Sequence, residues 1–329
     1  MGGSLSEPES RAAFGAVMQG EATPAQVAAL LVGLRVKGET PEEVAGAADA
    51  LRGAMVHLPA TDPGELVDTC GTGGGAVGTF NISTAAALLA AGLGVRIAKH
   101  GNRSFTSQCG SADVLEALGV PIEVSVDVMA HALRDAGIVF MFAPLMHPAM
   151  RHVGPVRREL AIPTVMNIVG PLANPASAGR QVVGVADATR VPLIAGALRQ
   201  LGTVHAMVVH GEPGMDEVSP LGTTHVVEIR DGAIREWTID PARYGFPAGD
   251  AGALRGGSPS ANAAAVRAVL NGSAPATALA AVVLNAAAAL YVAPGGPTDY
   301  GDAIHAARAG LRAGAGMTAL ARLRSAYGV

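Results

Sequence analysis

Two adjacent acids, Asp216 and Glu217, lie in a glycine-containing loop that follows the short apolar run Ala206–Val209. Mg²⁺ takes oxygen ligands, commonly one or two carboxylates together with substrate phosphates, so such a pair suits this ion. An Asp-Glu pair in a turn is more often simply solvated. The pair therefore indicates a metal site only if other loops of the chain point to a phosphate-rich ligand.

A glycine-rich loop over residues 68–75 offers such a phosphate site. It leads to Asn81, Ser83 and Thr84 at the start of an alanine-rich helical segment. Glycines let backbone N–H groups approach an anion, and a helix N-terminus adds free N–H donors with partial positive charge. The loop fits neither the Walker nor the Rossmann pattern, so it indicates neither ATP nor NAD.

A second polar loop, residues 99–107, follows a predicted strand over Val95–Ala98 and carries Lys99, Arg103 and three hydroxyl side chains. Ligands of open α/β sheets bind at the carboxyl ends of strands, so this loop should lie beside the first one. Further along, Arg157 could grip a carboxylate through two parallel hydrogen bonds. A basic surface helix explains that segment equally well, and spacing alone leaves both interpretations open.

The elements that position these loops fall into two groups. Near the N-terminus, Thr23-Pro24 and Thr40-Pro41 each give a helix N-cap followed by proline at the first helical position, and no strand pattern occurs. We therefore expect a small all-helical domain over residues 1–64, joined by helices from about 150–172. The remainder, 65–329, should form a large α/β domain.

Short apolar runs alternate with helical patterns through this second region, which predicts a mostly parallel central sheet. The runs include Val139–Phe142 and Val182–Val185. Asp231-Gly232 between two alternating segments is a hairpin signal. From Ala261 onward the pattern is mainly helical.

Composition narrows the class of protein. Half of the 329 residues are hydrophobic and 15% are charged, which excludes a disordered or coiled-coil chain. A formal net charge of -4 gives no support for a nucleic-acid or membrane-surface partner. The two cysteines, Cys70 and Cys109, are too few for a disulfide framework. With no apolar stretch that fits a membrane span and no signal-peptide pattern, we expect a cytoplasmic protein.

Several long motifs, in the same order, resemble the anthranilate phosphoribosyltransferase family, which transfers the phosphoribosyl group of phosphoribosyl pyrophosphate (PRPP) to anthranilate in the second step of tryptophan biosynthesis from chorismate. The resemblance covers nearly the whole chain and is strongest over residues 79–84, 99–103, 110–119 and 170–175. It implies a small helical domain joined to a large α/β domain, a homodimer formed through the small domains, and Mg²⁺ as cofactor.

The resemblance also implies site residues, listed here by ligand. PRPP would be held by Gly71, Gly74, Gly75, Thr79, Asn81, Ile82, Ser83, Thr84, Lys99, His100, Gly101, Asn102, Arg103, Ser104, Phe105, Thr106, Ser107 and Ser111. Anthranilate would meet Gly71, Asn102, Arg157, Ala143, Pro144, His147, Met150 and Gly170, with Arg157 on its carboxylate. Ser83, Asp216 and Glu217 would serve Mg²⁺.

No catalytic base is nominated, because an aromatic amine is already a neutral nucleophile. Positioning and stabilisation of the leaving group should dominate instead. His100 would be a structural or lining residue. Two positions depart from the family pattern: Gly75 stands where an aspartate is usual, and Pro163 where an arginine is common.

Two other functions stay open. A pyrimidine nucleoside phosphorylase would share the fold but use phosphate in place of PRPP, and the segments around Asn81 and Lys99 fit it less well. A non-catalytic paralogue that binds nucleic acid should have a basic surface and a degraded metal pair. The net charge of -4 and the intact Asp216-Glu217 pair count against that second alternative.

Overall fold

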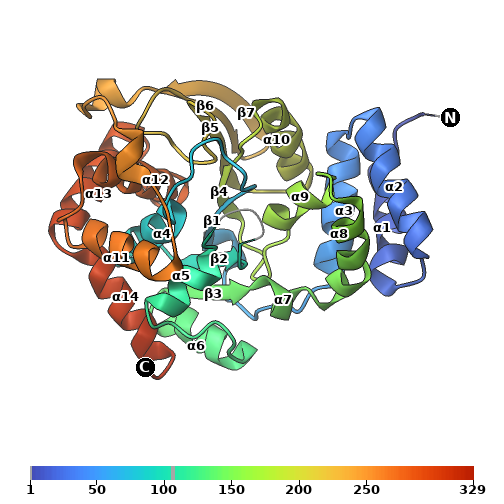
Figure 1. Ribbon diagram of the computed structural model, residues 1–329, viewed down its shortest axis with the longest axis horizontal. Coiled ribbons are helices and arrows are strands. Elements are labelled where there is room, and N and C mark those ends of the chain that lie inside the picture. Colours follow the sequence, from blue (N-terminus) through green and yellow to red (C-terminus); the bar gives the residue numbers. More distant parts are fainter. Residues whose placement is uncertain (1, 105–107) are drawn as a thin grey trace.

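The computed structural model describes residues 2–104 and 108–329 of the chain. Figure 1 shows a small helical lobe at one end, a twisted sheet in the middle and the C-terminal helices on the far side. The fold is therefore the predicted one: a helical N-terminal domain followed by a large α/β domain.

Three helices begin the chain: α1 (Glu7–Gln19), α2 (Pro24–Lys37) and α3 (Pro41–Gly53). Thr23 and Thr40 cap α2 and α3 as expected, and each forms a reciprocal capping box with the residue three positions on. Later in the chain, α8 (Gly154–Leu160) packs against α2, and α9 (Met166–Val169) packs against α3. The linker between strands β3 and β4 thus returns to the small domain.

The sheet of the described residues has seven strands in the order β3-β2-β1-β4-β5-β6-β7. The strands are β1 (Val67–Gly71), β2 (Ile97–Gly101), β3 (Ile138–Phe142), β4 (Arg180–Gly184), β5 (His205–Gly211), β6 (Thr224–Arg230) and β7 (Ala233–Ile239). β1 to β5 run parallel, and β6 and β7 form an antiparallel hairpin around the predicted Asp231-Gly232 turn.

Several strands continue into segments that were predicted as loops: β1 includes residues 68–71, and β5 includes His210 and Gly211. The strand expected over Val95–Ala98 spans Ile97–Gly101, so Lys99 and His100 belong to β2 and not to the loop that follows it. The apolar run ends at Ala98, but pairing with β3 continues through residue 101. The polar side chains at these two positions have buried partners, which is why the strand can continue.

Nine further helices complete the described chain: α4 (Ile82–Gly92), α5 (Ser111–Ala117), α6 (Val126–Asp135), α7 (Ala143–Met146), α10 (Val191–Gln200), α11 (Pro259–Leu270), α12 (Ala276–Val292), α13 (Tyr300–Arg312) and α14 (Ala315–Ala326). Short 3₁₀ turns occur between them, among them Pro148–His152 and Gly170–Leu172. None of the helices in the described ranges is long and apolar enough to cross a membrane.

Successive side chains of the central strands go to opposite faces of the sheet. Val182 and Met207 pack with α4 and the helices α11 to α14, whereas Val183 and Val208 pack with α10 and the small domain. The chain moves in one direction from β1 to β3 and then crosses back to place β4 on the other side of β1. A crevice at the carboxyl ends of β1 and β4 is the usual ligand site of such a sheet.

Candidate functional site

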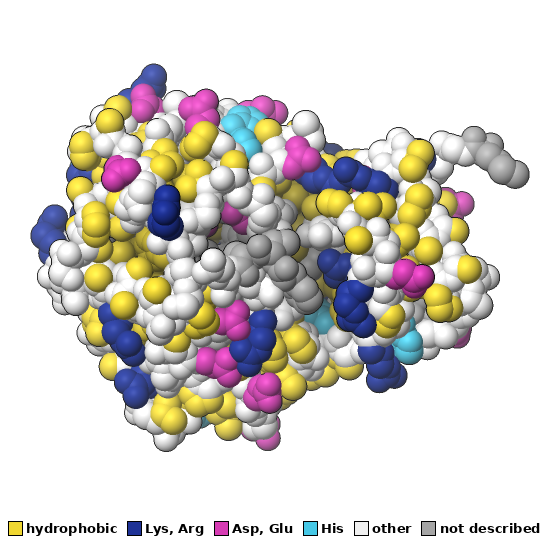
Figure 2. All heavy atoms as spheres, in the orientation of Figure 1, with side chains coloured by type: hydrophobic (Ala, Val, Ile, Leu, Met, Phe, Trp, Pro, Cys, Tyr) yellow, Lys and Arg dark blue, Asp and Glu magenta, His cyan; other side chains and the backbone are white. Residues whose placement is uncertain are grey.

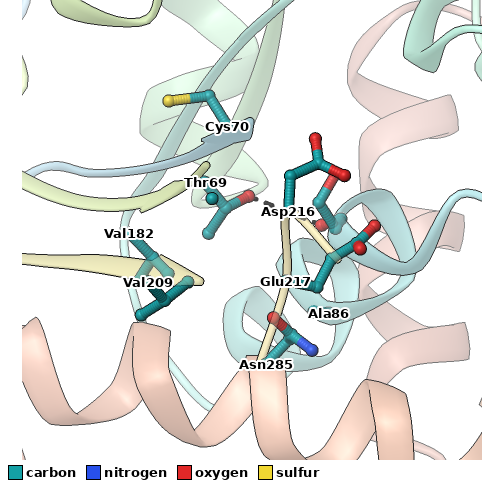
Figure 3. Close-up of a pocket in the computed structure, with 10 residues that line it drawn as sticks. Thr69, Cys70, Ala86, Val182, Val209, Asp216, Glu217 and Asn285 are labelled. Carbon is teal, nitrogen blue, oxygen red and sulfur yellow. Dashed lines mark hydrogen bonds between the residues drawn. The ribbon is translucent and has the colours of Figure 1, made fainter. Parts of the chain in front are cut away.

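A pocket lies at this switch point, between the ends of β1 and β4, the start of α4 and the segment after β5. Its lining includes Thr69, Ser83, Asp216, Glu217 and Asn285. Figure 3 shows the carboxylates of Asp216 and Glu217 on one short segment, above the Asn285 side chain of α12. The two acids and the serine predicted to serve a metal are therefore brought together.

A tight turn places the acids there. The Gly211 N–H donates to the Met215 carbonyl at 3.0 Å, and the Met215 N–H donates back at 2.7 Å, which reverses the chain after β5. The Gly73 N–H then donates to Asp216 Oδ2 at 2.8 Å. This hydrogen bond joins the glycine loop to the acidic segment across 143 residues of sequence.

Glycine is required where the acidic segment crosses the strand ends. A Cβ on Gly184 would lie 1.7 Å from the backbone oxygen of Asp216, and a Cβ on Gly71 would lie 2.5 Å from Asp216 Oδ2. Gly75 also faces this carboxylate, since its Cβ would lie 3.2 Å from Asp216 Oδ1. Gly74, with φ of +79°, has open space around it.

The electrostatics of the acid pair favour a cation. Burial raises the pKa of Asp216, and burial together with the neighbouring Asp216 charge raises the pKa of Glu217 well above its usual value. No lysine or arginine within the described ranges forms an ion pair with either acid, although Thr79 Oγ1 donates to Glu217 Oε1 at 3.4 Å. Two close carboxylates with a hydroxyl nearby are a donor set that fits Mg²⁺, whose charge would relieve their repulsion.

Lys99 contacts two residues that line this pocket, Thr69 and Ser83. Its side chain is buried, and its Nζ donates to the Thr69 carbonyl, to Thr69 Oγ1 and, at 3.4 Å, to Ser83 Oγ. Burial lowers the pKa of Lys99, while the charge of Asp68 acts in the opposite direction. The ammonium group therefore brings positive charge to the first turn of α4.

The other residues predicted for PRPP surround the same sheet edge, with differences in what their side chains do. Asn81 occupies the N-cap position of α4 without a side-chain capping hydrogen bond, and its Oδ1 instead accepts from Asn262 Nδ2 at 2.8 Å. Ile82 and Thr84 are buried in the core, so only their backbones can reach a ligand there. Gly101 ends β2 and lies against Ser111 at the start of α5.

The segment after β2 is held by α5. The Arg103 guanidinium pairs with Asp113 at 2.8 Å and with Glu116 at 2.5 Å, so this arginine would have to leave both acids to meet PRPP. The Asn102 carbonyl accepts from Ser111 Oγ at 3.3 Å. The Ser104 N–H donates to Asp113 Oδ2 at 3.2 Å, while Phe105, Thr106 and Ser107 lie outside the described residues.

Most residues predicted for anthranilate lie on the linker between β3 and β4, whereas Gly71 ends β1 and Asn102 directly follows β2. Ala143 and Pro144 open α7, and Met150 lies in the following 3₁₀ turn. His147 Nε2 lies 3.1 Å from His100 Nε2, and the backbone of Gly170 bonds to His100 as well. The structure thus brings His100, His147 and Gly170 into one group.

Arg157 stands on α8 with no acid within ion-pair distance in the described part of the chain. Burial lowers the pKa of its guanidinium, and nothing offsets that effect. Figure 2 shows basic side chains gathered over this part of the small domain, on the edge that faces the large domain. A partly buried guanidinium without a carboxylate partner suits an anionic ligand.

Sequence patterns missed three asparagines that support the site. Asn174 donates to Asp68 at 2.8 Å, Asn262 holds Asn81, and Asn285 contacts the backbone beside Glu217. Each contact spans more than 60 residues of sequence, so no local pattern could have revealed it.

The fold and this site define a two-domain glycosyl transferase. Residues 1–55 match the family model described as "Glycosyl transferase family, helical bundle domain", and residues 63–317 match "Glycosyl transferase family, a/b domain".

Comparison with similar proteins identifies the family within this class of glycosyl transferases. The chain is 48% identical over 320 residues to the anthranilate phosphoribosyltransferase of Chloroflexus aggregans, covering 97% of this chain and 93% of that one. It is 50% identical over 323 residues to the enzyme of that name from Roseiflexus sp., covering 98% and 94%. The crystal structure of the Thermus thermophilus anthranilate phosphoribosyltransferase matches with a TM-score of 0.93 and 41% identity, covering 100% of this chain and 97% of that one.

The enzyme from Saccharomyces cerevisiae, solved in complex with PRPP and Mg, matches with a TM-score of 0.88 and 27% identity, covering 98% and 94%. This chain belongs to the anthranilate phosphoribosyltransferase family.

Proposed function

We propose that this protein transfers the phosphoribosyl group of PRPP to the amine of anthranilate, with Mg²⁺, and releases N-(5-phosphoribosyl)anthranilate and pyrophosphate. One observation carries the proposal: Asp216 and Glu217 meet the glycine loop at the switch point of the sheet, beside Ser83. The full-length relatives bear the name of this reaction, and this favours it over the phosphorylase and the non-catalytic alternatives.

The PRPP phosphates would be bound by backbone N–H groups of the glycine loop and by hydroxyls at the start of α4. Asp216, Glu217 and Ser83 would hold Mg²⁺, which when bound neutralises charge on the leaving pyrophosphate. Lys99 adds positive charge next to Ser83 in the same turn. Preorganised donors and charges of this kind stabilise charge that develops on a leaving group.

On the acceptor side, Arg157 would bind the anthranilate carboxylate in a bidentate pair. His100 and His147 are too weakly basic to act as a general base, because burial, with the neighbouring imidazole as a further cause for His100, lowers the pKa of His100 to about 3 and that of His147 to about 4. Both rings are therefore neutral at pH 7. We assign them to orientation of the aromatic acceptor, whose amine needs no base to become nucleophilic.

The function is tested by mixing purified protein with anthranilate, PRPP and Mg²⁺ and following the loss of anthranilate fluorescence. Controls omit one component at a time. Loss that requires protein, PRPP and metal together is the expected result. No loss, with PRPP binding still measurable by calorimetry, would point to a different acceptor, and no PRPP binding would favour the phosphorylase or non-catalytic alternative.

We also propose a homodimer that forms through α2. Val36 is 81% exposed, and Ala25 and Ala29 are exposed on the same helix, with Val32 half-buried between them. Their spacing of four, three and four residues makes an apolar seam suited to a helix of a second copy. Val36→Glu should give a monomer by light scattering after gel filtration, and Val329→Glu, at an exposed valine elsewhere, is the matched control. A dimer that survives Val36→Glu would contradict this interface.

The chain has two cysteines, Cys70 and Cys109, which are too few for a disulfide framework. This low cysteine content accords with a reducing compartment and supports the cytoplasm as the proposed location.

A further inference from the structure

Asn285 makes an unusual set of contacts with the segment that carries the two acids. Its Oδ1 accepts from the Val218 N–H at 2.9 Å, and its Nδ2 donates to the Val218 carbonyl at 2.9 Å. The second Nδ2 proton goes to the Ala281 carbonyl, one turn earlier in α12, also at 2.9 Å. Both amide protons and the amide oxygen therefore have partners, and these donors and acceptors fix the orientation of the side chain.

Val218 directly follows Glu217 and is fully buried. Residues 216–218 belong to no helix or strand. Within the described part of the chain, the backbone of residues 216–218 is hydrogen-bonded to another element through Asn285, which accepts one bond from Val218 and donates one to it. An unpaired buried N–H or carbonyl costs free energy. By pairing both groups of Val218, the Asn285 amide stabilises the conformation of residues 216–218.

The helix that carries Asn285, α12, is held in place by packing on several sides. α12 packs against α4, which carries Ser83, and against β1 and β4, which carry the glycine positions of the site. Nearly all of its residues are buried. Figure 3 shows Asn285 projecting from this helix toward the segment of Glu217. Asn285 therefore links the acid pair to α12, and α12 packs against the helix that carries Ser83, the other proposed metal ligand.

We propose that Asn285 is a positioning residue for the proposed metal site: it fixes the Asp216-Glu217 carboxylates relative to Ser83 and so sets the Mg²⁺ affinity of the enzyme. This rests on the metal role proposed above. Residues that orient metal ligands commonly contribute 10- to 100-fold to metal affinity. A role confined to folding would instead lower stability without changing the metal dependence.

Asn285→Ala in the full-length protein removes both bonds to Val218. Metal affinity is measured directly, as Mn²⁺ bound in the presence of PRPP, from the loss of the free-ion EPR signal. The Mg²⁺ concentration for half-maximal activity, the anthranilate KM and Tm are measured alongside. We expect metal affinity to fall about tenfold and the anthranilate KM to change by less than about twofold.

Tyr300→Phe is the matched control. Tyr300 is buried, and its hydroxyl donates at 2.8 Å to the carbonyl of Leu284, the residue next to Asn285 on α12, without touching the acidic segment. This variant should lose stability but keep the wild-type metal affinity. If Asn285→Ala does not fold, Asn285→Ser, which keeps a small polar group at the position, takes its place and should weaken metal binding in the same direction.

The inference is overturned if a folded Asn285 variant keeps the wild-type Mn²⁺ affinity, or if Tyr300→Phe weakens metal binding as much. Asp216→Asn with Glu217→Gln separates this failure from a failure of the proposed function. Unchanged Mn²⁺ binding in that double variant would remove the metal site altogether. Weakened binding there, with no effect at Asn285, would leave the site in place and refute only the positioning role.

Discussion

The buried pair of His100 and His147 should make this protein sensitive to mild acid. The two Nε2 atoms lie 3.1 Å apart, a contact in which one ring donates and the other must accept, so the two rings cannot both be protonated. Burial and the His147 ring lower the pKa of His100 to about 3, and burial lowers that of His147 to about 4, from an ordinary value of 6.5.

The sign and size of the effect follow from proton linkage. Below pH 6.5 the unfolded chain takes up protons at both histidines that the folded protein refuses until about pH 4. Acid therefore favours the unfolded state across that window. Between pH 7 and pH 5 each histidine should cost about 2 kcal/mol of stability, a large share of the roughly 5–15 kcal/mol typical of a folded protein.

Urea unfolding at pH 7 and pH 5 measures this directly. The loss of unfolding free energy on acidification should be about 2 kcal/mol smaller in His147→Asn than in the wild type. His305→Asn, at an exposed histidine on α13, should lose as much as the wild type. The reasoning is refuted if the wild type is equally stable at both pH values, or if His147→Asn retains the full pH dependence.

Three further changes test other parts of the structure. Arg157→Ala should raise the anthranilate KM at least about 30-fold and leave the PRPP KM nearly unchanged, while Arg158→Ala, at its exposed neighbour, should change neither; steady-state kinetics decides. Gly75→Asp would add a third carboxylate to the Asp216-Glu217 pair, so the Mg²⁺ concentration for half-maximal activity should fall. An unchanged concentration would place residue 75 outside the metal site. Burial opposes ionisation of Glu228, but the hydrogen bonds it accepts lower its pKa to about 2. Its stabilising charge is present above its ordinary value of 4.5 and is lost toward pH 2, so the Tm difference between wild type and Glu228→Gln should be largest at pH 7 and shrink on acidification.

Local sequence patterns were sufficient to locate most elements and the edge of the sheet where the candidate site lies, but they misplaced the ends of strands such as β2. Capping residues such as Thr23 and Thr40 define helix starts through hydrogen bonds within four residues, and Asp231-Gly232 defines the hairpin through its own backbone. Apolar runs located the central strands, because buried parallel strands are apolar on both faces.

Local sequence patterns could not predict contacts between residues that are far apart in the sequence. Lys99 can lie in a buried strand because its ammonium group donates to Thr69 and Ser83. These contacts cannot be predicted from the pattern of apolar residues. Arg103 was assigned to PRPP by resemblance, yet its charge is engaged with Asp113 and Glu116. Asn262 and Asn285 look like ordinary helix residues until the fold brings them to Asn81 and to the acidic segment.

The most direct test of the account is the phosphoribosyl transfer activity of Asp216→Asn with Glu217→Gln, measured by anthranilate fluorescence across a Mg²⁺ titration, with Tm as the check on folding. The account predicts a folded protein whose activity is largely lost and does not return at Mg²⁺ concentrations that saturate the wild type. Wild-type turnover in the double variant would contradict the metal role of this acid pair, and with it the placement of the active site at the switch point of the sheet.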